Sequence, residues 1–474
     1  GRNRMHHTVR ANSNERHRML SHHWMKFLAA CLSVLVVWGY PIAVDAAGGG
    51  GGTLNEAESR LLLLLAIIGV AYLVTHLVLE RVAERYGFVT GIEYVVLGAI
   101  LSPVLGLIEA EDINAMTPAI VLGTGSLGLL TGLHVDISEF RESMPKRALK
   151  IALIVSVVTA VVVLVLPAFA IYYFHSMELM LSLAPGLLCV GTVALVADAG
   201  PIRAMISYLG AEGPGTDLGI KTAQLCASVG VILFGLIFCV YNPTDLPFVP
   251  KGPSGPFVWF AVHLLLGSVL GLIFSWLLRR DFGDEKILTV VIGMVIFASG
   301  MAYYLQLSPI FVNFVLGVVL MNLGRHSAHV ESRLMSIRRP LYILLFFFAG
   351  AGWALDAPWW TYALVVPYLL LRWFGRNIGG LLSLRVAATE ARNAGISRAL
   401  MAPGALSVAM LLDFDQVYES LYYEPVIYNG LLLAIVISEM TSYKLTRTWL
   451  IDATDVAPPE QRESSAFRRA GTRD

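Results

Sequence analysis

The sequence predicts an all-α polytopic membrane protein in which about thirteen helices cross the bilayer. Hydrophobic residues make up 56% of the chain and charged residues only 14%, whereas about a quarter of the residues of a typical soluble domain are charged. From residue 58 onward the apolar residues occur in runs of roughly 20, the length that spans a membrane as a helix. Two of these runs are interrupted in the middle by neighbouring glycine and proline residues. Such interruptions at corresponding places in two halves of a chain are typical of inverted repeats.

Residues 1–46 are predicted to precede the membrane domain. A polar stretch leads to the apolar segment Phe27–Val44, which is followed by Asp45 and Ala46. Small residues one and three positions before the cut suit signal-peptidase cleavage after Ala46. An uncleaved additional helix is the alternative, because the apolar run approaches the minimum spanning length. Residues 47–57 then form a glycine-rich linker.

The membrane domain is predicted over residues 58–446, and a short cytoplasmic tail over 447–474. The predicted spans are 58–80, 88–108, 116–134, 147–173, 180–208, 216–241, 255–279, 285–305, 308–323, 338–356, 358–384, 397–413 and 423–446. Signal cleavage leaves the first span starting outside, so an odd number of spans puts the C-terminus in the cytoplasm. Lys and Arg are concentrated in the loops that this topology places inside, as the positive-inside rule requires. We expect a multi-pass protein of the cell inner (plasma) membrane.

The first interrupted span carries a carboxylate beside its break. Val190–Ile202 contains Asp198, followed by Ala199, Gly200 and Pro201. Proline removes a backbone donor and glycine tolerates a broken conformation, and such a break is permitted at membrane depth only where it lines a protein-buried or watery cavity. A carboxylate at that depth is costly and predicts a functional site. The alternative is a proline kink with an Asp that a neighbouring group satisfies.

The second interrupted span, 397–413, contains Pro403 and Gly404, and six predicted helices separate it from the first. Paired interruptions of this kind are the best sequence indication of a transporter built from inverted repeats. The half-helix ends then place partial charges around a site near the midplane, positive at the N-termini and negative at the C-termini.

Three residues are predicted to share one depth in the membrane. Asp198 lies 12 residues before Gly210, Ser228 lies 12 after Thr216, and Arg372 lies 12 before Leu384. Twelve helical residues cover about 18 Å, roughly half the apolar layer with some tilt. An Arg at this depth needs a partner, for which Asp198 is the first candidate and Glu439 the second; alternatively, Arg372 only holds helices together. Arg376 lies one turn further inward and could share the role.

Several motifs along the chain resemble those of the monovalent cation:proton antiporter superfamily, with the Kef-type sodium/hydrogen exchanger membrane domain as the most similar branch. The resemblance covers residues 58–446 and is carried, in order, by Tyr86–Phe88 with Gly98–Pro103, Gly128–Asp136, Leu307–Gly317, Leu345–Gly350 and Pro403–Ser407. It implies a homodimer, a core with two crossing broken helices and an elevator-like movement. It also implies that a cation and protons compete for buried carboxylates, with a basic residue at the position matching Arg372.

The sequence departs from this family pattern at the ion site. An aspartate is expected at the position matching Ser228, but the chain has Ala227-Ser228 there, and a serine hydroxyl does not titrate near neutral pH. Asp198 would then carry a titratable site alone, and Thr192 could supply a nearby oxygen. Glu93 could line an inner funnel or make a helix-packing hydrogen bond. Glu439, with Lys444 about one turn on, is expected to form a structural ion pair rather than to bind a ligand.

The motifs exclude several function classes. We find no P-loop, no dinucleotide-binding glycine motif and no HExxH or GxSxG motif, and the four cysteines lack metal or disulfide spacing. We therefore expect no enzyme activity and no cofactor or metal beyond a transported cation, and the zero net charge gives no indication of nucleic-acid binding.

Three functional hypotheses remain. The first is a sodium or potassium:proton antiporter centred on Asp198. The second is a non-transporting scaffold or sensor, which Ser228 favours. The third is a channel or carrier for an anionic or neutral solute, with Arg372 as the attracting charge.

Overall fold

The computed structural model describes residues 91–108, 110–174, 176–211, 213–242, 254–278, 284–324, 327–354, 357–386, 395–418 and 423–452. All of them belong to one compact unit that begins at Phe88. The elements within these residues are helices, as the sequence predicts. The predicted signal peptide, the linker, the span 58–80 and most of the tail lie outside the described residues. The other predicted spans each correspond to a helix or a broken helix.

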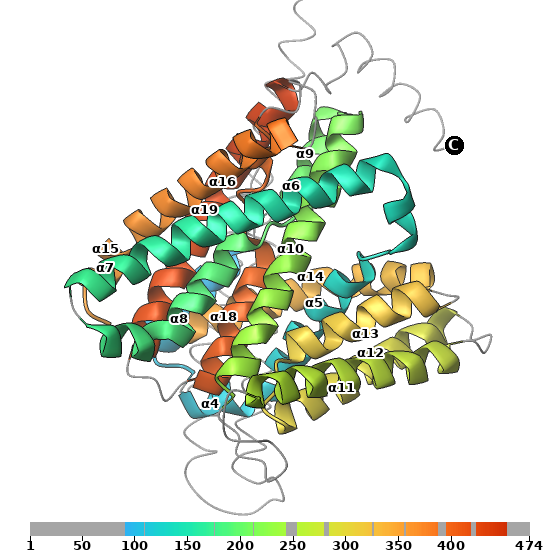
Figure 1. Ribbon diagram of the computed structural model, residues 1–474. Coiled ribbons are helices and arrows are strands. Elements are labelled where there is room, and N and C mark those ends of the chain that lie inside the picture. Colours follow the sequence, from blue (N-terminus) through green and yellow to red (C-terminus); the bar gives the residue numbers. More distant parts are fainter. Residues whose placement is uncertain are drawn as a thin grey trace, which may run out of the picture. The chain divides into compact units, whose positions relative to one another are not determined.

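The helices form two bundles (Figure 1). The first, called here the α5 bundle, consists of α3 (Ile92–Ala99) with its continuation η1 (Ile100–Val104), α5 (Thr117–Leu133), α11 (Gly255–Leu277), α12 (Asp284–Tyr304), α13 (Pro309–Leu323) and α14 (Ser327–Ala351). The short α4 (Ala110–Ala115) precedes α5, and η2 (Ser138–Arg141) connects α5 to the second bundle.

The second bundle, called the α8 bundle, contains the two broken helices. Its members are α6 (Ser143–Ala160) with η3 (Val161–Val165) and α7 (Leu166–Phe174), α8 (Met177–Leu195), α9 (Gly200–Leu209), α10 (Pro214–Val240), α15 (Trp360–Ala363), α16 (Val365–Val386), α17 (Ile396–Ala399), α18 (Gly404–Tyr418) and α19 (Glu424–Asp452). The chain enters the α8 bundle twice, first with α6 to α10 and then with α15 to α19. Each of these two segments contains one broken helix. This order fits the predicted repeat.

Two glycines in the sequence motifs allow helix backbones to touch within the α5 bundle. A Cβ on Gly128 of α5 would lie 2.2 Å from the carbonyl oxygen of Ile310 in α13. A Cβ on Gly350 of α14 would lie 1.9 Å from the carbonyl oxygen of Val95 in α3. Small residues at helix contacts are typical of membrane proteins, where close packing replaces the hydrophobic driving force between helices. The motif glycines therefore fix the packing of this bundle.

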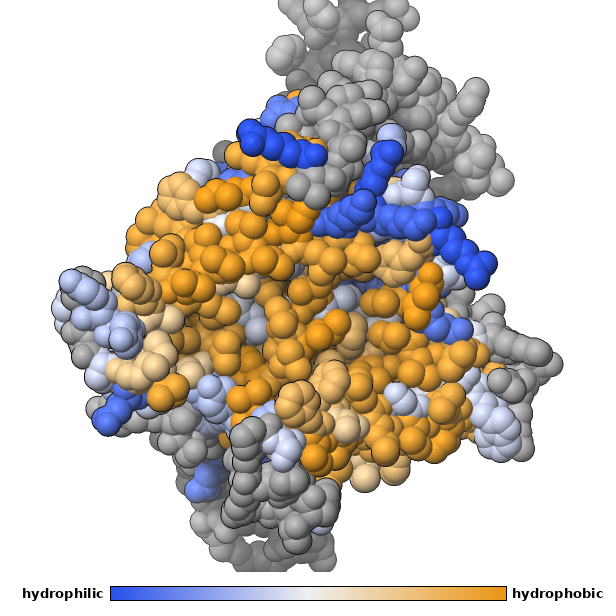
Figure 2. Space-filling view, in the orientation of Figure 1, coloured by the Kyte–Doolittle hydropathy of each residue, from blue (hydrophilic) through white to orange (hydrophobic). Residues whose placement is uncertain are grey.

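The outer surface suits a membrane rather than water. Six helical segments among the described residues are long and apolar enough to cross a bilayer. Along α6–α7 every fourth residue is an exposed large hydrophobe: Leu153, Val157, Val161, Val165, Phe169 and Tyr173, with exposed fractions from 44% to 71%. Figure 2 shows hydrophobic residues across most of the drawn face, with hydrophilic residues gathered near the start of α6. Exposed apolar area on this scale marks a lipid-facing surface, so the chain is a multi-pass membrane protein.

Two helix boundaries differ from the prediction and matter for the site. Helix α14 begins at Ser327, well before the predicted start at 338, so Arg338 lies inside a helix rather than at its entrance. Helix α18 continues to Tyr418, so Asp413 lies inside it rather than at the start of an outer loop. Packing shields most of the Arg338 side chain and buries Asp413, which a hydropathy pattern does not register.

Candidate functional site

The two broken helices cross, and their extended segments touch. Helix α8 ends at Leu195 and α9 begins at Gly200, while α17 ends at Ala399 and α18 begins at Gly404. The backbone N–H of Asp198 donates to the carbonyl oxygen of Ala402 at 2.8 Å. The predicted breaks are confirmed: Gly200 and Pro201 are the first residues of α9, and Pro403 lies just before α18.

Gly404 sits directly against Asp198. Its φ is +67°, and a Cβ there would lie 2.4 Å from Cβ of Asp198 and 2.7 Å from its Oδ2. Both the left-handed conformation and the lack of space require glycine. The crossing point is therefore tight enough that the backbone of one broken helix fixes the carboxylate of the other.

Carboxylates bind the N-terminal ends of α9 and α18, the half-helices that follow the two breaks. Oδ1 of Asp198 accepts from the Gly200 N–H at the start of α9, at 2.9 Å. Oε2 of Glu439, on α19, accepts from the Gly404 N–H at the start of α18, at 3.1 Å. A negative charge is stabilised at a helix N-terminus, where the peptide dipoles leave a partial positive charge. The expectation that Glu439 serves mainly as a partner of Lys444 is thus corrected, because its buried carboxylate belongs to the crossing.

Arginine side chains bind the C-terminal ends of the first half-helices, α8 and α17. Arg372 donates to the carbonyl oxygens of Ala194 at 3.2 Å, Val196 at 3.1 Å and Met401 at 3.0 Å. Arg376 donates through Nη2 to the same Ala194 and Val196 oxygens, at 2.9 and 2.8 Å. These carbonyls end α8 and α17, where the helix dipole leaves a partial negative charge.

The predicted pairing of Arg372 with Asp198 is therefore wrong. The hydrogen bonds of Arg372 go to backbone carbonyls, whereas Glu439, the second predicted partner, interacts with Arg372 electrostatically while its carboxylate accepts from the Gly404 N–H. A guanidinium has five donors and no need of a carboxylate when several free carbonyls converge on it. The contacts are those of the alternative interpretation, in which Arg372 holds helices together.

Asp198 pairs instead with Arg338 of α14. Nη2 of Arg338 lies 3.3 Å from Oδ1 of Asp198, and the two side chains are 18% and 19% exposed. Nε of Arg338 donates to the hydroxyl of Tyr342, one turn further along the same helix, at 2.5 Å. Arg338 was not predicted as a site residue, because the predicted span begins at this position. Arg338 and Tyr342 are four residues apart within an apolar run, and this spacing was the sequence signal that could have identified Arg338.

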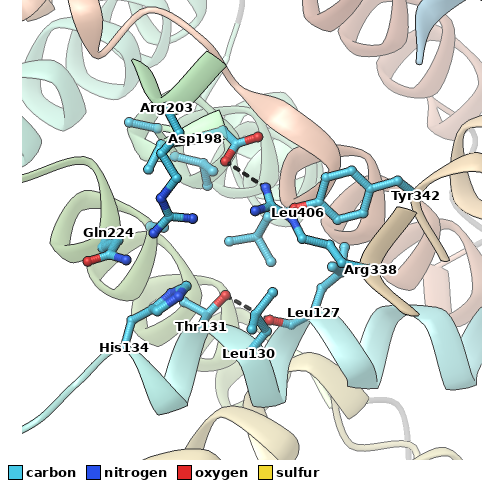
Figure 3. A pocket seen from close by; sticks show the side chains of 14 residues that line it. Leu127, Leu130, Thr131, His134, Asp198, Arg203, Gln224, Arg338, Tyr342 and Leu406 are labelled. Atoms are coloured by element: carbon cyan, nitrogen blue, oxygen red, sulfur yellow. Dashed lines mark hydrogen bonds and ion pairs between the residues drawn. The ribbon is translucent and has the colours of Figure 1, made fainter. Parts of the chain in front are cut away.

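A cavity surrounds this pair at the boundary of the two bundles (Figure 3). It holds about 50 Å³, and a neighbouring cavity of about 300 Å³ shares Asp198, Arg203, Arg338 and Tyr342 with it. In Figure 3 the half-buried Arg203 of α9 also points into the space, and Leu127 and Leu130 of α5 close another side. The cavity thus holds one carboxylate between two guanidinium groups.

Helix α10 presents a different residue to this cavity than predicted. Gln224 and Ala227 line it, whereas the hydroxyl of Ser228 donates to the carbonyl oxygen of Gln224 in its own helix, at 3.0 Å. The hydroxyl of Thr192 likewise donates within its own helix, to Cys189 at 2.9 Å. Ser228 and Thr192 are therefore not brought to Asp198.

The remaining polar candidates lie around the larger cavity. Glu439 and Tyr443 line it from α19, and the half-buried Glu93 of α3 interacts electrostatically with Tyr443.

Asp413 of α18 lies away from both cavities. It is 2% exposed, and its Oδ2 accepts from the Ser308 hydroxyl at the start of α13, at 2.6 Å. This buried carboxylate joins α18 of one bundle to α13 of the other.

Comparisons with known proteins agree with this architecture. Two structures of the sodium proton antiporter MjNhaP1 from Methanocaldococcus jannaschii, one of them determined at pH 8 and one given as an electron-microscopy map, each match with a TM-score of 0.60 and 14% identity. The matches cover 83% and 84% of this chain and 99% of the antiporter. No curated protein matches the chain.

The family model described as "Sodium/hydrogen exchanger, transmembrane" matches residues 70–442. This range includes both broken helices, the residues of the cavity and most of the described helices. The chain therefore belongs to the sodium/hydrogen exchanger family.

Proposed function

We propose that the protein is a secondary active transporter that exchanges a monovalent cation, sodium or potassium, for protons. The observation that carries the proposal is the position of Asp198, whose carboxylate lies at the helix crossing and faces a cavity between two bundles. An ionisable residue in that position inside a membrane protein marks an ion or proton pathway. Family membership supports the same assignment.

The chemistry requires that cation and proton exclude one another at Asp198. A carboxylate accepts a proton or ligates a cation through its oxygens, and either event cancels its charge. Hard cations prefer oxygen ligands, and the cavity offers the side-chain oxygens of Gln224 and Thr131 beside Asp198. These three residues are the proposed ligand set.

Transport further requires that the site open alternately to each side. We assign this to an elevator-like movement of the α8 bundle, which carries Asp198, against the α5 bundle. Support comes from the position of the cavity at the boundary of the bundles and from the rigid crossing around Asp198. The proposal includes a homodimer in the inner membrane, with the N-terminus outside after signal cleavage and the C-terminus in the cytoplasm.

One observation favours the non-transporting alternative. The position where the family pattern calls for a second carboxylate is Ser228, and the α10 residues that line the cavity are Gln224 and Ala227. A scaffold or sensor that keeps the fold has no need of that carboxylate. The two guanidinium groups beside Asp198 also favour a third function, that of a carrier for an anionic solute.

Proton movement in sealed proteoliposomes separates these functions. Vesicles with a pH gradient receive sodium, potassium or lithium in turn, for wild type and for Asp198→Asn. Asp217→Asn is the matched control, because Asp217 is exposed at the start of α10. We expect a cation-triggered pH response that Asp198→Asn abolishes and Asp217→Asn keeps. No response to any cation from folded, inserted wild type contradicts the antiporter, and a response to anions alone favours the anion carrier.

A further inference from the structure

We propose that Arg338 is a coupling residue that latches the two bundles together whenever Asp198 carries neither cation nor proton. The inference rests on the proposed function and names a residue that prevents the carrier from moving empty. It follows from where the two members of the Asp198–Arg338 pair are anchored.

Each member of the pair is fixed to a different bundle. The backbone of Asp198 is hydrogen-bonded to Ala402, within the crossing of the α8 bundle. Arg338 lies on α14, whose backbone touches α3 of the α5 bundle at Gly350. The ion pair between them, at 3.3 Å, therefore bridges the surface along which the bundles would slide.

The Arg338 guanidinium is oriented toward Asp198 by a hydrogen bond within its own helix. Nε of Arg338 donates to the Tyr342 hydroxyl on its own helix, which orients the group so that Nη2 points to Asp198. Both side chains are mostly shielded, and charges are screened less by solvent and salt when partly buried than when exposed. Tyr342 is thus a positioning residue for the latch.

The state of Asp198 decides how strongly the latch holds. An ionised, empty Asp198 attracts Arg338, and sliding the bundles would separate two opposite charges in a mostly shielded cavity. A bound cation or proton cancels the charge of Asp198 and removes that attraction. The loaded carrier then lacks this restraint while the empty carrier keeps it, which favours exchange over leak. A ligand shifts such an equilibrium by its differential affinity for the two states.

Arg203 provides a matched comparison. It reaches the same cavity but lies on α9, within the α8 bundle that carries Asp198. It would travel with Asp198, and its acidic neighbour on the α5 bundle is Glu331 of α14. Loss of either arginine removes one positive charge from the neighbourhood of Asp198, so both substitutions change the local potential, but only loss of Arg338 removes the ion pair with Asp198.

The test measures tracer cation efflux from proteoliposomes at one fixed alkaline pH, where protons are scarce on both sides. Efflux is compared with and without the same cation outside, using the cation to which wild type responds. For wild type we expect rapid exchange and slow net efflux, because the unloaded carrier is latched. In Arg338→Gln we expect the ratio of exchange to net efflux to fall roughly tenfold, within the range typical of coupling between sites.

The controls separate a latch from a general electrostatic effect. Arg203→Gln should lower the ratio less than Arg338→Gln does, and Arg338→Lys, which keeps the charge without the planar fork, should restore most of it. The proposal is overturned if Arg338→Gln keeps the wild-type ratio, or if Arg203→Gln lowers it equally.

A double-mutant cycle tests the pair without transport. Thermal unfolding of Arg338→Gln, Asp198→Asn and the double variant should be non-additive if the two side chains are coupled. If wild type moves no cation, the proposed function fails while this cycle still judges the ion pair. Additive losses of stability contradict the pairing itself, whatever the transport result.

Discussion

Substitution of Gly404 by alanine tests the tight crossing of the broken helices most directly. Two costs combine at this position. Gly404 has a φ of +67°, and a Cβ there would meet Cβ of Asp198 at 2.4 Å. Left-handed backbone costs an L-residue roughly 1–2 kcal/mol, and overpacking a filled site costs about 1–3 kcal/mol. The expected loss of stability for Gly404→Ala is therefore about 2–5 kcal/mol.

Gly210 supplies a control that separates the two costs. It has a similar φ of +60°, but a Cβ there would meet nothing within 4 Å. Gly210→Ala should therefore lose only the backbone contribution, roughly 1–2 kcal/mol. The reduced entropy of the unfolded chain is common to both variants and cancels in the comparison.

The assay combines thermal unfolding in detergent with cation-triggered proton movement in proteoliposomes. We expect Gly404→Ala to lower the apparent melting temperature more than Gly210→Ala and to abolish transport, because the new methyl group displaces Asp198. A third variant, Gly404→Ala combined with Asp198→Gly, removes the clashing Cβ and should bring the cost of the Gly404 change close to that at Gly210. Equal losses of stability for Gly404→Ala and Gly210→Ala, with transport retained in both, would refute the tight contact.

Two further predictions concern buried polar groups. Arg372→Met should destabilise the protein by about 1–3 kcal/mol more than Arg376→Met, because the Met401 carbonyl loses the Arg372 donor while both acceptors of Arg376 keep a bond from Arg372. Equal melting temperatures for the two variants would contradict this division of roles. Asp413→Ala should cost about 1–3 kcal/mol, because the buried Ser308 hydroxyl loses its acceptor. Asp413→Asn should cost less, since an amide oxygen can still accept; thermal unfolding distinguishes the two outcomes.

The sequence was sufficient for the fold and for the position of Asp198 at the helix crossing. Glycine and proline inside apolar runs predicted both breaks, and Asp198 beside one of them predicted the carboxylate at the crossing. These features depend on local backbone chemistry and on the cost of charge in a membrane, which a single sequence displays. Position along a helix can be estimated from the sequence, because the rise per residue is fixed.

The direction in which a side chain points around the helix axis could not be predicted from the sequence in the same way. Neighbouring residues of an α-helix point about 100° apart, so an error of one position changes which side chain meets a cavity. Ser228 was the residue expected at the site, but Ala227 lines the cavity. Only the packing of α10 against its neighbours decides between them.

The partners of the arginines were missed for a different reason. Sequence reasoning pairs a buried cation with a carboxylate, yet the carbonyls exposed by a broken helix offer Arg372 three acceptors. Arg338 was missed because a charge near the end of an apolar run is typical of a loop. Helix α14 begins before that run, and packing shields most of the Arg338 side chain.

The four half-helix ends at the crossing explain why the site needs so many charged residues. Asp198 and Glu439 compensate the two N-terminal ends, and Arg372 and Arg376 compensate the C-terminal ends. These contacts lie within the α8 bundle, so they persist in the proposed movement of that bundle as a unit. Arg338 differs because it comes from the other bundle and meets Asp198 in the cavity. Substitution of Arg372 or Arg376 should therefore affect stability of the crossing, whereas substitution of Arg338 should affect the coupling of movement to binding.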